Sequence, residues 1–94
     1  MKFTGSEGTI SSVAVSSTTA VLAAANDNRK YMIVHNLSGA EIFIAFAATA
    51  DHTAGNYTVK LADGSAYEVP ALYLGAVSAI TETASGNVNV TIVE

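Results

Sequence analysis

The stretch that decides the fold runs from residue 29 to residue 46 and reads RKYMIVHNLSGAEIFIAF. Residues 31–34 are apolar without a break, which predicts a central strand covered on both faces. The turn residues 36–39 follow, and residues 41–46 form a second apolar run. We expect the two runs to pair as a hairpin. In the second run, Phe43 and Ala45 should face one way, and Ile42, Ile44 and Phe46 the other.

Similar short runs, rich in β-branched residues and bounded by turn residues, extend outward on both sides of this stretch. The expected strands are residues 10–16, 18–22, 29–35, 41–46, 57–61, 66–69, 73–80 and 88–93. The chain has no room for the crossover helices that a parallel sheet needs. The sequence therefore predicts an all-β fold, a single antiparallel β-sandwich or jelly-roll-like domain of about eight strands.

Local residue choices refine this prediction. Asp63-Gly64 is a hairpin signal between two of the runs, and Pro70 ends the run that follows because proline cannot donate to a ladder. Alternation in residues 57–61 places Tyr57 with Val59 and Leu61 on one face. The alanines at residues 23–25 allow one helical turn before the Asn-Asp-Asn cluster stops it.

Two segments fall outside the strand pattern. Residues 1–9 contain little apolar content and are expected to form an extended N-terminal arm, which leaves residues 10–94 as the β-sandwich domain. The alanine-rich loop at residues 46–56 is longer than the turns around it. Long loops often carry binding, but this one lacks Trp, Arg and clustered aromatics, so it fits a neutral spacer equally well.

Charge is scarce in this chain. Only 13% of its 94 residues are charged, about half of the ~25% in an ordinary soluble domain, whereas 50% are hydrophobic. Such a surface must be covered by small polar residues or buried against partners. The second reading is favoured, because interface cores are depleted of charge. Composition therefore favours a domain that assembles.

Several classes of partner and site are not expected. Arg29-Lys30 is the single cluster of positive charge in a chain of net charge −4, too little for a nucleic-acid partner. No apolar run is long enough to span a membrane, and the first residues do not resemble a signal peptide. Without cysteine there is neither a disulfide framework nor a thiolate metal site, and synthesis in a reducing cytoplasm is expected.

Catalytic signals are weak. His35 ends the central strand and is expected to be a structural residue hydrogen-bonded at a sheet end. His52 follows Asp51 in the long loop, where a solvated pair is expected, and a small hydrolase built on the two is the alternative. The acidic residues are scattered singly along the chain. We therefore expect no enzyme, and no catalytic, cofactor-binding or metal-binding residues.

Other polar residues suit structural roles. Asn26, Asn28 and Asn36 are expected to close turns through their side chains. Arg29 offers five donors and is expected to clamp turn carbonyls or to pair with a carboxylate such as Glu94. Gly64 and Gly75 are expected where the backbone needs unusual freedom or a close approach.

From residue 22 onward the sequence resembles a known group of proteins. The similarity is carried by LAAANDNR (22–29), YMIV (31–34), NLS (36–38), EIFIA (41–45), LADGSAYE (61–68), YLGAVSAI (73–80) and NVNVTIVE (87–94). These motifs are similar to those of small tailed-bacteriophage virion structural proteins, of the head decoration, cement or head-fibre type.

This resemblance implies a β-sandwich that oligomerises, often as a trimer, on a capsid or tail surface. We expect a capsid decoration or cement protein that binds the head lattice as a homotrimer, located in the virion after synthesis in the host cytoplasm. The expected partners are the major capsid protein or another virion protein. The alternative is a tail- or fibre-associated receptor- or carbohydrate-binding module. The resemblance implies no catalytic residues and no cofactor.

Overall fold

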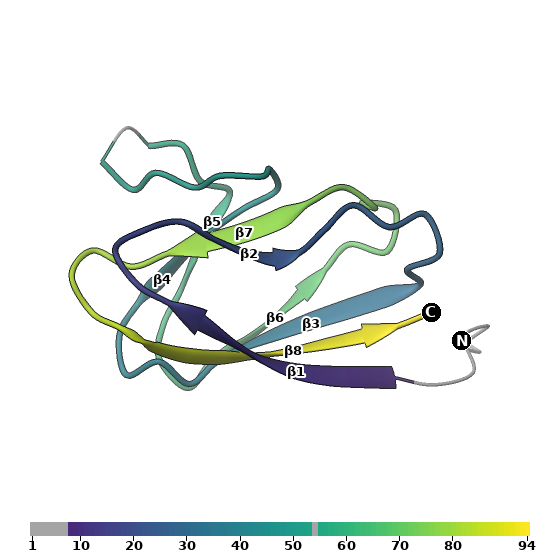
Figure 1. The fold of residues 1–94 in the computed structure, drawn as a ribbon, viewed down its shortest axis with the longest axis horizontal. Coiled ribbons are helices and arrows are strands. Elements are labelled where there is room, and N and C mark those ends of the chain that lie inside the picture. Colours follow the sequence, from purple (N-terminus) through teal and green to yellow (C-terminus); the bar gives the residue numbers. More distant parts are fainter. Residues whose placement is uncertain (1–7, 54) are drawn as a thin grey trace.

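The computed structural model describes residues 8–53 and 55–94, which form two four-stranded sheets packed face to face (Figure 1). The strands are β1 (Gly8–Val15), β2 (Ala20–Ala23), β3 (Tyr31–Asn36), β4 (Ile42–Ala45), β5 (Val59–Leu61), β6 (Ala66–Val69), β7 (Val77–Ile80) and β8 (Gly86–Val93). The first sheet has the order β1-β8-β3-β6 and the second β2-β7-β4-β5. All pairings are antiparallel, and this strand order is that of a jelly roll. The predicted fold class is confirmed.

Alternation along the strands builds the core between the sheets. In β8, Val88 and Val90 point inward and are fully buried, whereas Asn87 and Asn89 point outward. The core consists of Val15, Leu22, Ala23, Met32, Val34, Ile42, Ile44, Leu61, Val69, Val77, Ala79, Val88 and Val90. Most of these residues are aliphatic, so this core is held mainly by interdigitated branched side chains.

The predicted hairpin between residues 29–35 and 41–46 is wrong. β3 pairs with β6 and β8 in the first sheet, whereas β4 pairs with β5 and β7 in the second. The turn after Asn36 therefore carries the chain from one layer to the other. β3 is also covered on one face only, since Met32 and Val34 are buried while Ile33 is half-exposed. The predicted face assignments within β4 are confirmed, because Ile42 and Ile44 join the core while residues 43 and 45 face away from it.

The Asp63-Gly64 turn likewise crosses between sheets and does not close a hairpin, because β5 and β6 belong to different layers. Gly64 has a φ of +82°, a left-handed conformation that glycine adopts without strain, so the expected need for backbone freedom is confirmed. Tyr57 precedes β5 and packs on Phe43, outside the inter-sheet core, so its predicted place beside Val59 and Leu61 is wrong.

Several other predicted segments differ from the structure, and most strand boundaries shift by one or two residues. β1 already begins at Gly8, so residues 8 and 9 of the expected arm belong to the first sheet, and residues 1–7 lie outside the described residues. No helical turn forms at residues 23–25, because Ala23 ends β2 and the next residues lead directly into the turn closed by Asn26. The strand predicted at residues 73–80 begins at Val77.

A buried arginine holds the loops together at the start of β3. Arg29 is only 3% exposed, and its guanidinium donates to the carbonyl oxygens of Ala24 (3.4 Å), Tyr73 (3.0 Å) and Gly75 (2.9 Å). The expected clamp on turn carbonyls is confirmed. Glu94 instead accepts a hydrogen bond from Asn26 Nδ2 at 2.6 Å. The arginine therefore joins the segment before β3 to the loop between β6 and β7.

A buried asparagine forms hydrogen bonds with the turn at the other end of β3. Asn36 is 0% exposed, and its Nδ2 donates to the carbonyls of Ala40 (2.7 Å) and Leu61 (2.9 Å). Its Oδ1 accepts from the backbone N–H (3.0 Å) and the hydroxyl (2.7 Å) of Ser38. The expected turn closure is confirmed. Because Leu61 ends β5, this side chain also ties the two sheets to each other.

Candidate functional site

His35 lies at the end of β3, and its Nε2 is 3.3 Å from the Gly64 carbonyl oxygen. This contact agrees with the structural role expected for it. In the part of the chain that the structure describes, no three His, Asp or Glu side chains gather so that they could hold a metal ion. The same part contains no helix long and apolar enough to cross a membrane.

His52 packs against an aromatic cluster and is not a simple solvated loop residue. Its ring lies 5.4 Å from that of Phe43, which meets Tyr57 edge-on at 5.0 Å. The Nδ1 atom of His52 is shielded from solvent and has no hydrogen-bond partner among the described residues. Asp51, its neighbour, accepts hydrogen bonds from the N–H and hydroxyl of Thr53. These contacts shape the loop around residue 52.

The long loop covers the outer face of the second sheet. Ala50 is buried with Phe43, Ala45 and Ile80, and its N–H donates to Thr19 Oγ1 at 2.9 Å. In Figure 1 this loop rises beside β5 and β7. The contacts of Ala50 fix this part of the loop against the second sheet.

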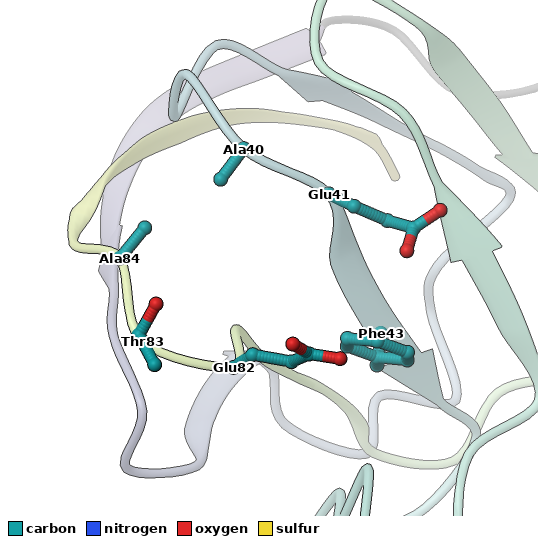
Figure 2. A pocket seen from close by; sticks show the side chains of 6 residues that line it. All are labelled: Ala40, Glu41, Phe43, Glu82, Thr83 and Ala84. Carbon is teal, nitrogen blue, oxygen red and sulfur yellow. The ribbon is translucent and has the colours of Figure 1, made fainter.

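A small hollow opens between the β3–β4 and β7–β8 connections (Figure 2). It has a volume of about 190 Å³ and is lined by Ala40, Glu41, Phe43, Glu82, Thr83 and Ala84. The Glu82 carboxylate lies beside the Phe43 ring, whereas the Glu41 side chain points away from the hollow. Neither histidine lines it. The hollow therefore offers negative charge next to an aromatic ring.

The tyrosines are occupied in packing and contacts within the domain. Tyr73 stacks on Phe46 at 4.7 Å and 17°, and its hydroxyl donates to the Ala76 carbonyl. Tyr67 lies 6.3 Å from the same phenylalanine. The pKa of Tyr31 is raised by a hydrogen bond to Glu68, by partial burial and by the negative charge of that carboxylate. Tyr67 and Tyr73 thus share one aromatic cluster with Phe46.

The sheet edges differ from one another in how well they are protected. Each sheet ends in two edge strands, β1 and β6 in the first and β2 and β5 in the second. β5 has three residues with Lys60 at its centre, and β6 has four, including Glu68, with Pro70 after them. β2 has four residues and an irregular register between Val21 and Ala23. Shortness, charge, proline and bulges all hinder pairing with another chain.

β1 has none of these protections. Its eight residues contain no charge and no proline, and they pair with β8 in an unbroken register from Gly8↔Val93 to Val15↔Gly86. Residues 8–12 are exposed throughout, with Ile10 72% exposed. Among the described residues β1 pairs with β8 alone, so every second residue directs its N–H and C=O away from the sheet. This strand is the candidate functional site.

The outer face of the first sheet adjoins this edge. The register places Ile10, Thr91, Ile33 and Glu68 in one row across β1, β8, β3 and β6. Gly8, Val93 and Tyr31 form the next row. Sequence reasoning missed this surface because it treated β1 as an ordinary strand. Its Thr, Ser and Gly content, unusual for a half-buried strand, was the available signal.

Comparison with known proteins supports the fold. No protein-family model and no curated protein matches the chain. A solved structure from Bacillus endospore appendages, described as a novel family of disulfide-linked pili, is similar with a TM-score of 0.56 and 16% sequence identity. The match covers 92% of this chain and 82% of that one. At this identity the likeness concerns the β-sandwich and not the function.

Proposed function

We propose that this chain is a non-enzymatic structural subunit that assembles with other proteins into a larger particle. The observation that carries the proposal is the β1 edge, an eight-residue strand without charge, proline or bulge that pairs on one side only among the described residues. A monomeric domain would be expected to protect this edge strand against pairing, as it protects β2, β5 and β6. The low charged fraction of 13% supports the same proposal.

The particle we propose is a tailed-bacteriophage virion, with the chain as a head decoration or cement protein that binds the major capsid protein or another virion protein. The resemblance of residues 22–94 to such proteins supports this setting. The structural neighbour comes from a different assembly, a disulfide-linked pilus. Because this chain has no cysteine, its own contacts with partners would not be disulfide-linked.

The decisive experiment mixes the purified chain with capsids of the phage that encodes it, prepared without this protein, and sediments them. We expect the chain to pellet with the capsids in a saturable ratio. A chain that stays in the supernatant at every concentration would refute the virion proposal. Multi-angle light scattering on the chain alone measures its oligomeric state, for which the resemblance predicts a homotrimer of about 29 kDa, three times 9.6 kDa.

The carbohydrate-binding module is the alternative proposal. It would need exposed aromatic rings, whereas Tyr67 and Tyr73 pack on Phe46, and Tyr57 packs on Phe43. Glycan-array binding that is lost on a Tyr31→Ala change, with the fold intact, would favour this module over the structural subunit.

A further inference from the structure

We propose that the β1 edge pairs with the β1 edge of a second copy of this chain, antiparallel about a two-fold axis, so that the two first sheets become one continuous eight-stranded sheet. This inference rests on the proposed structural function, names the partner of the exposed edge, and gives a two-fold dimer in place of the homotrimer that the resemblance implies. The joined sheet would have the strand order β6-β3-β8-β1 in the first copy and β1-β8-β3-β6 in the second copy. In Figure 1, β1 lies along the near side of the molecule, where another chain can reach it.

The first argument concerns which edges are available. Joining two sheets head to tail requires two different open edges on each molecule. Among the described strands only β1 is unprotected, since β2, β5 and β6 are short and carry a bulge, a lysine, or a carboxylate with a following proline. A two-fold contact uses the same edge on both copies and needs no second one. The distribution of protections therefore favours self-pairing of β1.

The second argument concerns charge. The chain carries a net charge of −4, so two copies repel each other in general. β1 contains no charged residue, and a two-fold contact there places no like charges directly opposite each other. A centred two-fold contact through β5 would oppose Lys60 to Lys60, and one through β6 would bring the two Glu68 carboxylates into neighbouring positions.

The third argument concerns shape. The exposed part of β1 consists of Gly8, Thr9, Ile10, Ser11 and Ser12, of which four are small. Small side chains leave room above and below the sheet for the residues of a strand that pairs at the usual separation of about 4.8 Å. The unbroken register with β8 keeps this part regular, without the bulge that would twist an edge away. The same pairing would extend the row through Ile10 and Ile33 across both copies.

The test compares two lysine variants that carry the same charge change at opposite edges of the first sheet. Ser12→Lys places a hydrated cation on β1, and Ala66→Lys places one on β6; both sites are exposed. Each change lowers the net negative charge and thus weakens general repulsion between copies. We expect wild type and Ala66→Lys to be dimers of about 19 kDa, twice 9.6 kDa, and Ser12→Lys to dissociate at least tenfold more readily. A monomeric wild type, an odd-numbered oligomer, or a Ser12→Lys variant that associates as tightly as wild type would overturn the inference.

Disulfide trapping gives a second readout that does not depend on how well the lysine variants fold. The chain has no cysteine, so a single introduced cysteine can cross-link only to another copy. A two-fold contact brings some β1 positions close enough for a disulfide, with Cα atoms within about 7 Å. Oxidation of separate Ile10→Cys, Ser11→Cys and Ser12→Cys variants should yield a covalent dimer for at least one, and Ala66→Cys should not. If none of the three cross-links faster than Ala66→Cys, the pairing is refuted. Capsid sedimentation of Ser12→Lys distinguishes the two proposals. If this variant is monomeric and still pellets with capsids, the structural function does not require pairing of β1 with a second copy.

Discussion

Removing the Asn36 side chain should cost much of the domain's stability. In Asn36→Ala the Leu61 carbonyl loses its donor and the Ser38 N–H loses its acceptor. The Ala40 carbonyl keeps a hydrogen bond from the Ser38 hydroxyl at 3.0 Å, so the two groups that lose this partner are the buried Leu61 carbonyl and the part-buried Ser38 N–H. At roughly 1–3 kcal/mol each, the free energy of unfolding should fall by about 4 kcal/mol. Since small domains have only about 5–15 kcal/mol in total, the melting temperature should drop by roughly 15–30 °C.

Asn36→Asp separates hydrogen bonding from volume. One carboxylate oxygen can still accept from Ser38, but the other would face the carbonyls of Ala40 and Leu61 with no proton to donate. The folded protein then holds the protonated acid more tightly than the unfolded chain does, so the pKa of residue 36 is raised. Stability is therefore retained below the unfolded pKa of about 3.9 and lost as the pH rises through the higher folded pKa.

Urea denaturation followed by circular dichroism measures both variants, at one protein concentration so that any association contributes equally. Ser38→Ala is the matched control, since it removes the hydroxyl alone and should cost about 1 kcal/mol. The reasoning would be refuted if Asn36→Ala lost less than about 1 kcal/mol. It would also fail if Asn36→Asp were as stable at neutral pH as at pH 4.

Three further changes test other features. Arg29→Lys should lower the free energy of unfolding by about 2 kcal/mol or more in urea titrations, because one ammonium cannot reach carbonyls that the planar guanidinium spans; an unchanged midpoint would contradict the clamp. Gly64→Ala should cost about 1–2 kcal/mol through its positive φ alone, since nothing lies within 4 Å of the added Cβ, and a larger loss than in Gly64→Asn is expected. Glu68→Gln should lower the pKa of Tyr31, seen as earlier phenolate absorbance in an alkaline titration. Because that pKa is raised in the folded state, wild type should lose stability above the unfolded pKa of about 10, and a Tyr31→Phe variant should lose less of it.

Strand positions and inward faces were predictable because they depend on neighbours in sequence. Val88 and Val90 alternate with asparagines, and the two faces of β4 follow from period two. The Arg29 clamp followed from its place beside a turn cluster. Pairing was not predictable in the same way. Turn residues at 36–39 and at Asp63-Gly64 show that the chain turns, but not whether the next strand joins the same sheet or the opposite one.

The candidate site was harder to foresee than the fold. The edge position of β1 depends on pairing with β8, which lies at the other end of the chain. The position of Tyr57 was also mispredicted, because it depends on contacts that the local pattern does not contain. The alternation of β5 begins only at Val59, so extending it two residues back placed the ring in the wrong layer. Contacts between distant segments decide which strands are edges and which rings are buried, and no local pattern contains them.

The pairing of Gly8 with Val93 has a mechanical consequence. The first described residue and the end of β8 lie side by side. A force that pulls these two ends apart therefore loads one pair of residues at a time and separates β1 from β8 progressively. A force applied between Gly8 and the connection before Gly86 acts along the strands instead and loads all eight pairs together. We expect β1 to separate from β8 at low force when the load acts between Gly8 and Val93. When the load acts between Gly8 and the connection before Gly86, we expect the separation to need a higher force.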